Sequence, residues 1–180
     1  NIVGLFRHKW HLEGLVREQS ETIRKTNLAM VDALSTIIEH RSTESGNHIL
    51  RIRRFTRILL HDVAQNCPEY NLSEGVIDII ANASALHDMG KISIPDAILN
   101  KPGRLTPEEY EVIKTHTTVG SQLVERLGGI GDTEYLRYAY NIALYHHERW
   151  DGNGYPLGLA GDEIPICAQV VGLADVFDAL

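Results

Sequence analysis

The stretch EGVIDIIANASALHDMGKI, residues 74–92, decides how this chain is expected to fold. Its apolar residues recur at helical spacing and predict a buried helix. His87 and Asp88 stand at the C-terminal end of that helix, and Lys91 follows within a turn. Burying a charged group is costly unless the group is paired or binds a metal ion. The stretch therefore predicts a helical core with a polar site at its edge, where Lys91 could place a cation beside a phosphate.

The rest of the 180-residue chain is also predicted to be helical, because no segment sustains the alternation of a strand. The sequence Thr106-Pro107-Glu108-Glu109 is a strong helix start, with an N-cap, a proline in the first turn and a glutamate at the third position. Four glycines and a proline make residues 148–163 a loop. We expect an all-α, multi-helix bundle. Its helices are expected at Ile2 to about His40, Glu44 to Ala64, Ser73 to Asp88, Thr106 to Leu127, Asp132 to His147, and from about Pro165 onward.

The first expected helix carries apolar residues seven apart, at Val16, Ile23, Met30 and Ile37. The companion positions are mixed in polarity, so the pattern fits a coiled-coil seam only in part. Two interpretations stay open: a stalk that forms a homodimer, and an amphipathic helix packed on its own domain. We expect residues 1–35 to form a helical linker after an upstream sensor or receiver domain. Residues 36–180 would form the main domain, with its last helices missing from this sequence.

Composition excludes several classes of protein. The net charge of −7 argues against binding to a nucleic-acid polymer, which usually requires a basic face. Cys67 and Cys167 are far apart and show no CxxC spacing, so they predict neither a disulfide framework nor a thiolate zinc site. No apolar run is long enough to cross a bilayer. We therefore expect a cytoplasmic protein without a membrane anchor.

Histidines and carboxylates at the edges of apolar helices form the candidate site. Each of them alone would be typical of an ordinary surface or core residue. If the helices converge, eight ligands meet, enough for two or three metal ions, and Asp178 could share the face of Asp175. Imidazole and carboxylate without thiolate favour iron or manganese and leave zinc, nickel and cobalt open. The eight candidates are Glu44, His48, His87, Asp88, His116, His146, His147 and Asp175. A second pair, His61-Asp62, faces away from His48 and is interpreted as a solvated helix end.

The string HDMGKI, then His116, then HHERWDGNGYP and ADVFDAL resembles the HD-GYP subgroup of the HD phosphohydrolase superfamily. The match covers roughly Val31 to Leu180, and the signature loop is Gly154-Tyr155-Pro156. The resemblance implies that all eight candidates except Glu44 are metal ligands, with Asp88 as the bridging carboxylate. Glu44 matches the extra carboxylate of members with a third metal ion. Lys91 matches a lysine that contacts the substrate phosphate.

The same resemblance implies a cyclic di-GMP phosphodiesterase that forms linear pGpG and, in some members, GMP. Asp88 and Lys91 would carry the chemistry, and Tyr155 would either contact the substrate or brace its loop. Hybrid cyclic dinucleotides stay open as substrates. A diguanylate cyclase (GGDEF) domain is an expected partner of the loop. The alternatives are a catalytically weak cyclic di-GMP sensor or docking module, and an HD hydrolase with another nucleotide substrate.

Overall fold

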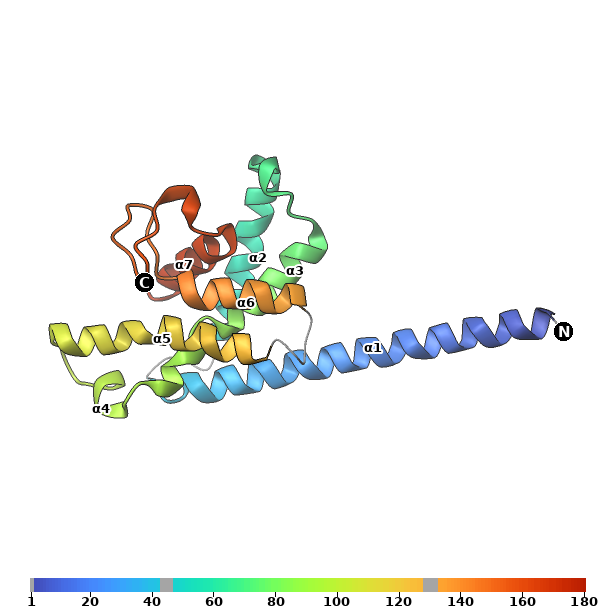
Figure 1. Ribbon diagram of the computed structural model, residues 1–180, viewed down its shortest axis with the longest axis horizontal. Coiled ribbons are helices and arrows are strands. Elements are labelled where there is room, and N and C mark those ends of the chain that lie inside the picture. The colour runs from blue at the N-terminus through green and yellow to red at the C-terminus, as the bar shows by residue number, and fades with distance from the viewer. Residues whose placement is uncertain (1, 43–46, 128–132) are drawn as a thin grey trace.

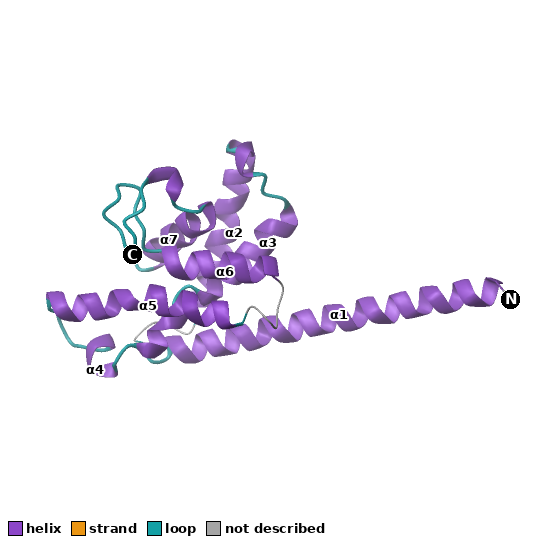
Figure 2. Cartoon of the chain, viewed as in Figure 1, coloured by secondary structure: helices purple, strands orange, loops and turns teal. Residues whose placement is uncertain are grey.

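The computed structural model describes residues 2–42, 47–127 and 133–180. Within these ranges the protein consists of helices and loops without any strand, apart from one isolated bridge between Asp151 and Ala160 (Figure 2). The predicted all-α class is therefore confirmed. Glu44 lies outside the described residues. None of the described helices combines the length and the apolar character that a membrane span requires.

The α-helices and short 3-10 segments follow one another along the chain with few long loops. The α-helices are α1 (Ile2–Glu39), α2 (His48–Asn66), α3 (Glu74–Ala83), α4 (Asp96–Leu99), α5 (Pro107–Arg126), α6 (Thr133–Tyr145) and α7 (Ile166–Asp178). The 3-10 segments are η1 (Pro68–Tyr70), η2 (Ser84–Leu86), η3 (Met89–Ser93) and η4 (Gly161–Glu163). The predicted helix start at Thr106 is present as a complete capping box with Glu109.

The core lies where α2, α3, α6 and α7 meet, and α5 packs on α6 and η3 (Figure 1). Ile52, Leu60, Ile80, Ile142 and Val171 are fully buried there. Burial of such side chains provides the main driving force for folding. The core therefore fixes how the ends of these helices are placed relative to one another.

The helix predicted from Ser73 to Asp88 ends earlier, and this boundary was wrong. The α-helix stops at Ala83 and gives way to the two 3-10 segments. The Ser84 hydroxyl donates to the Ala81 carbonyl at 2.7 Å, a local bond that competes with regular helix. Gly90 then passes so close to α5 that an added Cβ would lie 1.8 Å from the His116 carbonyl oxygen. The His87-Asp88 pair therefore stands on a turn between η2 and η3.

Helix α1 extends far beyond the other helices (Figure 1). Only its last turns pack on them, where Ser35, Ile38 and Glu39 are buried. The predicted apolar row (Val16, Ile23, Met30 and Ile37) does not face these helices, and each of its four side chains is 59–63% exposed. Packing on its own domain therefore accounts for the end of α1 but not for this row.

Candidate metal centre

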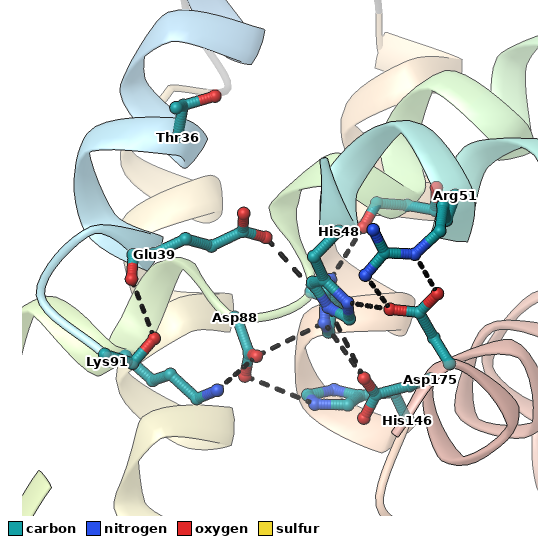
Figure 3. Close-up of polar contacts among 12 residues, drawn as sticks. Thr36, Glu39, His48, Arg51, Asp88, Lys91, His146 and Asp175 are labelled. Atoms are coloured by element: carbon teal, nitrogen blue, oxygen red, sulfur yellow. Dashed lines mark hydrogen bonds and ion pairs between the residues drawn. The ribbon is translucent and has the colours of Figure 1, made fainter. Parts of the chain in front are cut away.

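The structure brings seven of the eight predicted ligands to one place, and the eighth, Glu44, lies outside the described residues. They form two groups, within each of which one ligand atom per residue lies within 4.8 Å of the others. The first group holds Asp88, His116, His146 and His147, and the second holds His48, His87 and Asp175. They come from α2, the turn between η2 and η3, α5, the residues just after α6, and α7. Figure 3 shows several of these side chains pointing toward one another.

Asp88 lies between the two groups. Its Oδ2 is 3.2 Å from His87 Nε2, and its Oδ1 is 3.3 Å from His116 Nε2 and 3.8 Å from His146 Nε2. Nitrogen and oxygen ligands bind a divalent ion at about 2.0–2.2 Å, so neighbouring ligands of one ion lie about 3–4 Å apart. These spacings suit two neighbouring ions that share the Asp88 carboxylate.

The second group has the same spacing. Asp175 Oδ1 lies 3.6 Å from His48 Nε2 and 3.7 Å from His87 Nε2. Three atoms in this centre are buried and have no hydrogen-bond partner among the described residues: His48 Nε2, His87 Nε2 and Asp88 Oδ1. Buried polar atoms are normally satisfied. Cations bound by the two groups would supply the missing partners, so the donor set fits a divalent-metal site.

Backbone carbonyls orient three of the histidines. The Nδ1 atoms of His87, His116 and His146 lie 2.9, 2.7 and 2.9 Å from carbonyl oxygens three or four residues earlier. A carbonyl oxygen can only accept, so each Nδ1 carries a hydrogen, and in a neutral ring this leaves the lone pair on Nε2. Metal-binding histidines are usually held in this way through the second nitrogen.

His48 is held by a carboxylate instead. Its Nδ1 lies 2.7 Å from Asp178 Oδ2, and Arg51 donates to both oxygens of Asp178, at 2.5 and 2.8 Å. Asp178 therefore contacts His48 through Nδ1, whereas the second group contacts it through Nε2. The sequence suggested that Asp178 could share the face of Asp175, but it did not predict the link to Arg51.

Charge and burial set the protonation of the first group. Burial lowers the pKa of His116 and of His146, and it lowers the pKa of His147 to about 4. These imidazoles are therefore neutral near pH 7, with lone pairs available for a cation. Burial would raise the pKa of the Asp88 carboxyl, but the charges of His87 and Lys91 hold it well below its usual range. Asp88 is therefore an anion at the centre of the site.

In the second group, the pKa of His87 is raised instead of lowered. Burial would lower the pKa of His87, but Asp88 and Asp175 raise it well above its usual value. Burial would likewise raise the pKa of Asp175, but the close approach and charge of His87 lower it. A proton on His87 therefore takes the place that a divalent cation would fill between these carboxylates.

The depressed pKa of His147 predicts a pH effect on the metal-free chain. An unfolded histidine takes up a proton below about pH 6.5, while folded His147 stays neutral down to about pH 4. Acidification from pH 8 to 5 therefore favours the unfolded state through this residue. We expect His147→Gln to lose less unfolding free energy over this range than the parent chain. Urea denaturation at both pH values in the presence of a chelator measures the difference, and equal losses would contradict the assignment.

Lys91 and the signature loop border the ligands. Lys91 Nζ lies 2.6 Å from Asp88 Oδ2, and its side chain is only 16% exposed. The Tyr155 ring stacks on His147 at 4.8 Å between centroids, and its amide donates to the His147 carbonyl at 3.2 Å. An added Cβ at Gly154 would lie 2.4 Å from the Arg149 amide nitrogen, so the loop folds tightly back on the residues that follow α6. Pro156 follows Tyr155 through a cis peptide bond.

Glu39 is a further carboxylate beside the site that was not predicted from the sequence. Its carboxylate, in the last turn of α1, is buried and lies 4.0 Å from His48 Nε2 (Figure 3). No spacing rule links it to His48, because the two residues are on different helices. The second histidine–aspartate pair is away from the site, as expected, since His61 Nδ1 lies 3.5 Å from Glu74 on the surface.

The match to known proteins agrees with this geometry. Residues 28–180 match the HD domain family. The chain belongs to this family. Resemblance to its HD-GYP subgroup is confirmed by relatives that are named cyclic di-GMP phosphodiesterases and are about 40% identical over most of the chain.

Three relatives show how far the similarity extends. A probable cyclic di-GMP phosphodiesterase of Vibrio cholerae is 42% identical over 94% of this chain and 39% of its own length. A cyclic di-GMP phosphodiesterase of Thermotoga maritima is 42% identical over 84% of this chain and 38% of its own length. The 3'3'-cGAMP-specific phosphodiesterase 2 of Vibrio cholerae is 40% identical over 88% of this chain and 28% of its own length. The chain therefore spans less than two fifths of each of these proteins.

Proposed function

We propose that this chain is the catalytic domain of a metal-dependent phosphodiesterase that hydrolyses cyclic di-GMP to linear pGpG, with onward cleavage to GMP left open. The observation that carries the proposal is the position of Asp88 between two groups of ligands. Two divalent ions that share a carboxylate are a common arrangement for phosphodiester hydrolysis. The names of the relatives supply the substrate class.

The ions, their ligands and Lys91 would have different roles in hydrolysis. Bound divalent ions would lower the pKa of a water molecule and polarise the phosphoryl oxygen. Asp88 and the histidines would hold the ions, because Nε2 of each oriented ring faces the centre. Lys91 keeps a positive charge beside Asp88, where it can stabilise the negative charge that develops on the phosphoryl oxygens. Neither cysteine is required, since hydrolysis of this type needs no side-chain nucleophile.

We propose iron or manganese as the ions, one in each group, because the donors are imidazole and carboxylate without thiolate. A third ion at Glu44 stays a prediction. Metal content of anaerobically purified protein, measured together with turnover, tests both points. We expect two iron or manganese ions per chain from the two groups, and three if Glu44 binds a further ion.

The substrate is tested by incubating one preparation with cyclic di-GMP, cyclic GMP-AMP and dNTPs. We expect metal-dependent release of pGpG from cyclic di-GMP. Binding of cyclic di-GMP without turnover in the metal-loaded chain would instead favour the sensor or docking module. Faster hydrolysis of dNTPs would favour another HD hydrolase.

Two interactions are part of the proposal. The signature loop would dock on a GGDEF domain, and the exposure of the neighbouring side chains of Trp150 (64%) and Leu157 (65%) supports this.

The apolar row on α1 would form a homodimer, with residues 1–35 as the linker to the domain of residues 36–180. Replacing Ile23 and Met30 by Gln should shift the chain toward monomer in sedimentation experiments, and an unchanged mass would exclude this seam. The cytoplasmic location stays a prediction.

A further inference from the structure

A group of aromatic rings continues outward from the metal centre. Tyr155 covers His147 with its ring planes only 28° from parallel, and the Tyr110 ring meets Tyr155 edge-on at 6.3 Å between centroids. Lys114 Nζ lies 5.3 Å from the Tyr110 centroid and 5.7 Å from the Tyr155 centroid. Tyr110 and Lys114 are one helical turn apart on α5, the helix that also carries His116. We refer to Tyr110, Lys114 and Tyr155 as the aromatic patch.

The aromatic patch is accessible, and its charge suits a base better than a phosphate. Tyr110 is 46% exposed, and the Lys114 side chain is 26% exposed. Glu111 Oε1 lies 2.5 Å from Lys114 Nζ and is itself exposed. The Glu111 carboxylate offsets the charge of Lys114, so the pair attracts a phosphate less than an unpaired lysine would and leaves the binding of a neutral base unaffected. The ion pair also limits where the lysine can point.

The chemistry of the aromatic patch favours guanine. Bases stack on exposed aromatic rings and gain affinity in this way. A lysine can donate to O6 and N7 of guanine, whereas adenine presents an amino group in place of O6. In a cyclic dinucleotide, each base is separated from a phosphate by one ribose. With a phosphate at the metal centre, one base can therefore reach Tyr155, which stacks on His147, and the Tyr110 ring beyond it.

We propose that the aromatic patch binds one purine base of the substrate and selects guanine over adenine. This inference rests on the proposed function, since it assumes a phosphodiester bond of a cyclic dinucleotide at the metal centre. It assigns Tyr110 and Lys114 to substrate binding and gives Tyr155 a base to contact.

The test compares Tyr110→Ala and Lys114→Met with the parent chain. Because stacking contributes strongly to base binding, we expect KM for cyclic di-GMP to rise about tenfold or more in Tyr110→Ala. Tyr110→Phe keeps the ring and should restore the parent KM. Lys114→Met should lower the preference for cyclic di-GMP over cyclic di-AMP. Arg137→Met is the matched control, because Arg137 stands over Tyr138 at 5.0 Å in another part of the protein.

A purine-free substrate separates binding of the base from bracing of the loop. The loss caused by Tyr110→Ala should be at least about fivefold larger for cyclic di-GMP than for bis(p-nitrophenyl) phosphate. Equal losses on both substrates, with KM unchanged, would mean that the patch only braces the loop and would overturn the inference. An unaltered base preference in Lys114→Met would overturn the guanine assignment.

Failure of the proposed function gives a different result. If the parent chain does not hydrolyse cyclic di-GMP, the proposed activity is wrong, and calorimetric titration with pGpG still tests the aromatic patch. We expect Tyr110→Ala to weaken that binding about tenfold. Active parent protein with equal pGpG affinity in both chains would contradict the aromatic patch alone.

Discussion

Asp88→Asn is expected to abolish metal-dependent hydrolysis of cyclic di-GMP. The substitution keeps the size of the side chain but removes the negative charge between the two ligand groups. Loss of a residue that only supports a ligand costs about 10–100-fold in metal affinity or activity, so loss of a shared ligand should cost more than about 100-fold. Metal content and turnover should fall together, while far-UV circular dichroism should keep the helical signal.

Asp62→Asn provides a matched control for this prediction. Asp62 belongs to the other histidine–aspartate pair, is exposed on α2, and accepts a hydrogen bond from Asn66. The same chemical change there should leave metal content and turnover as in the parent chain. Near-normal metal content and hydrolysis in Asp88→Asn would refute the assignment of Asp88.

The amino-acid sequence predicted the all-α fold and the grouping of the candidate ligands for different reasons. Helical periodicity is a local property, so the helices could be located to within a few residues. The candidate ligands could be proposed because each of them lies at the edge or in the interior of an apolar helix, where an unpaired polar group would be costly. Periodicity alone could not show that they converge. That expectation came from the order and spacing of the motifs HDMGKI, HHERWDGNGYP and ADVFDAL.

Features that depend on contacts between distant segments were not predicted. Glu39 reaches His48 only because the end of α1 packs beside α2, and nothing local in the sequence indicates this approach. The Arg51–Asp178 pair likewise joins α2 to α7 across more than a hundred residues. The turn that follows α3 also depends on such a contact, because Gly90 lies against α5, in addition to the local bond of Ser84.

Gly90→Ala is therefore expected to combine loss of stability with loss of the site. An added Cβ would lie 1.8 Å from the His116 carbonyl oxygen and 2.6 Å from the Gly120 amide nitrogen. Both are backbone atoms of α5, so no side chain can rotate away and η3 must move. Overpacking usually costs about 1–3 kcal/mol, and this overlap should reach the upper end of that range or exceed it.

Movement of η3 should also lower the metal content, because Asp88 and Lys91 lie next to Gly90 in the chain and His116 lies on the opposing helix α5. Gly75→Ala is the matched control: its Cβ would meet only Ser73 Oγ at 3.9 Å, and alanine favours helix by up to about 1 kcal/mol. Urea denaturation of both variants, with metal analysis, makes the comparison. If Gly90→Ala were as stable as Gly75→Ala and kept its ions, the close approach of η3 to α5 could not be what positions Asp88.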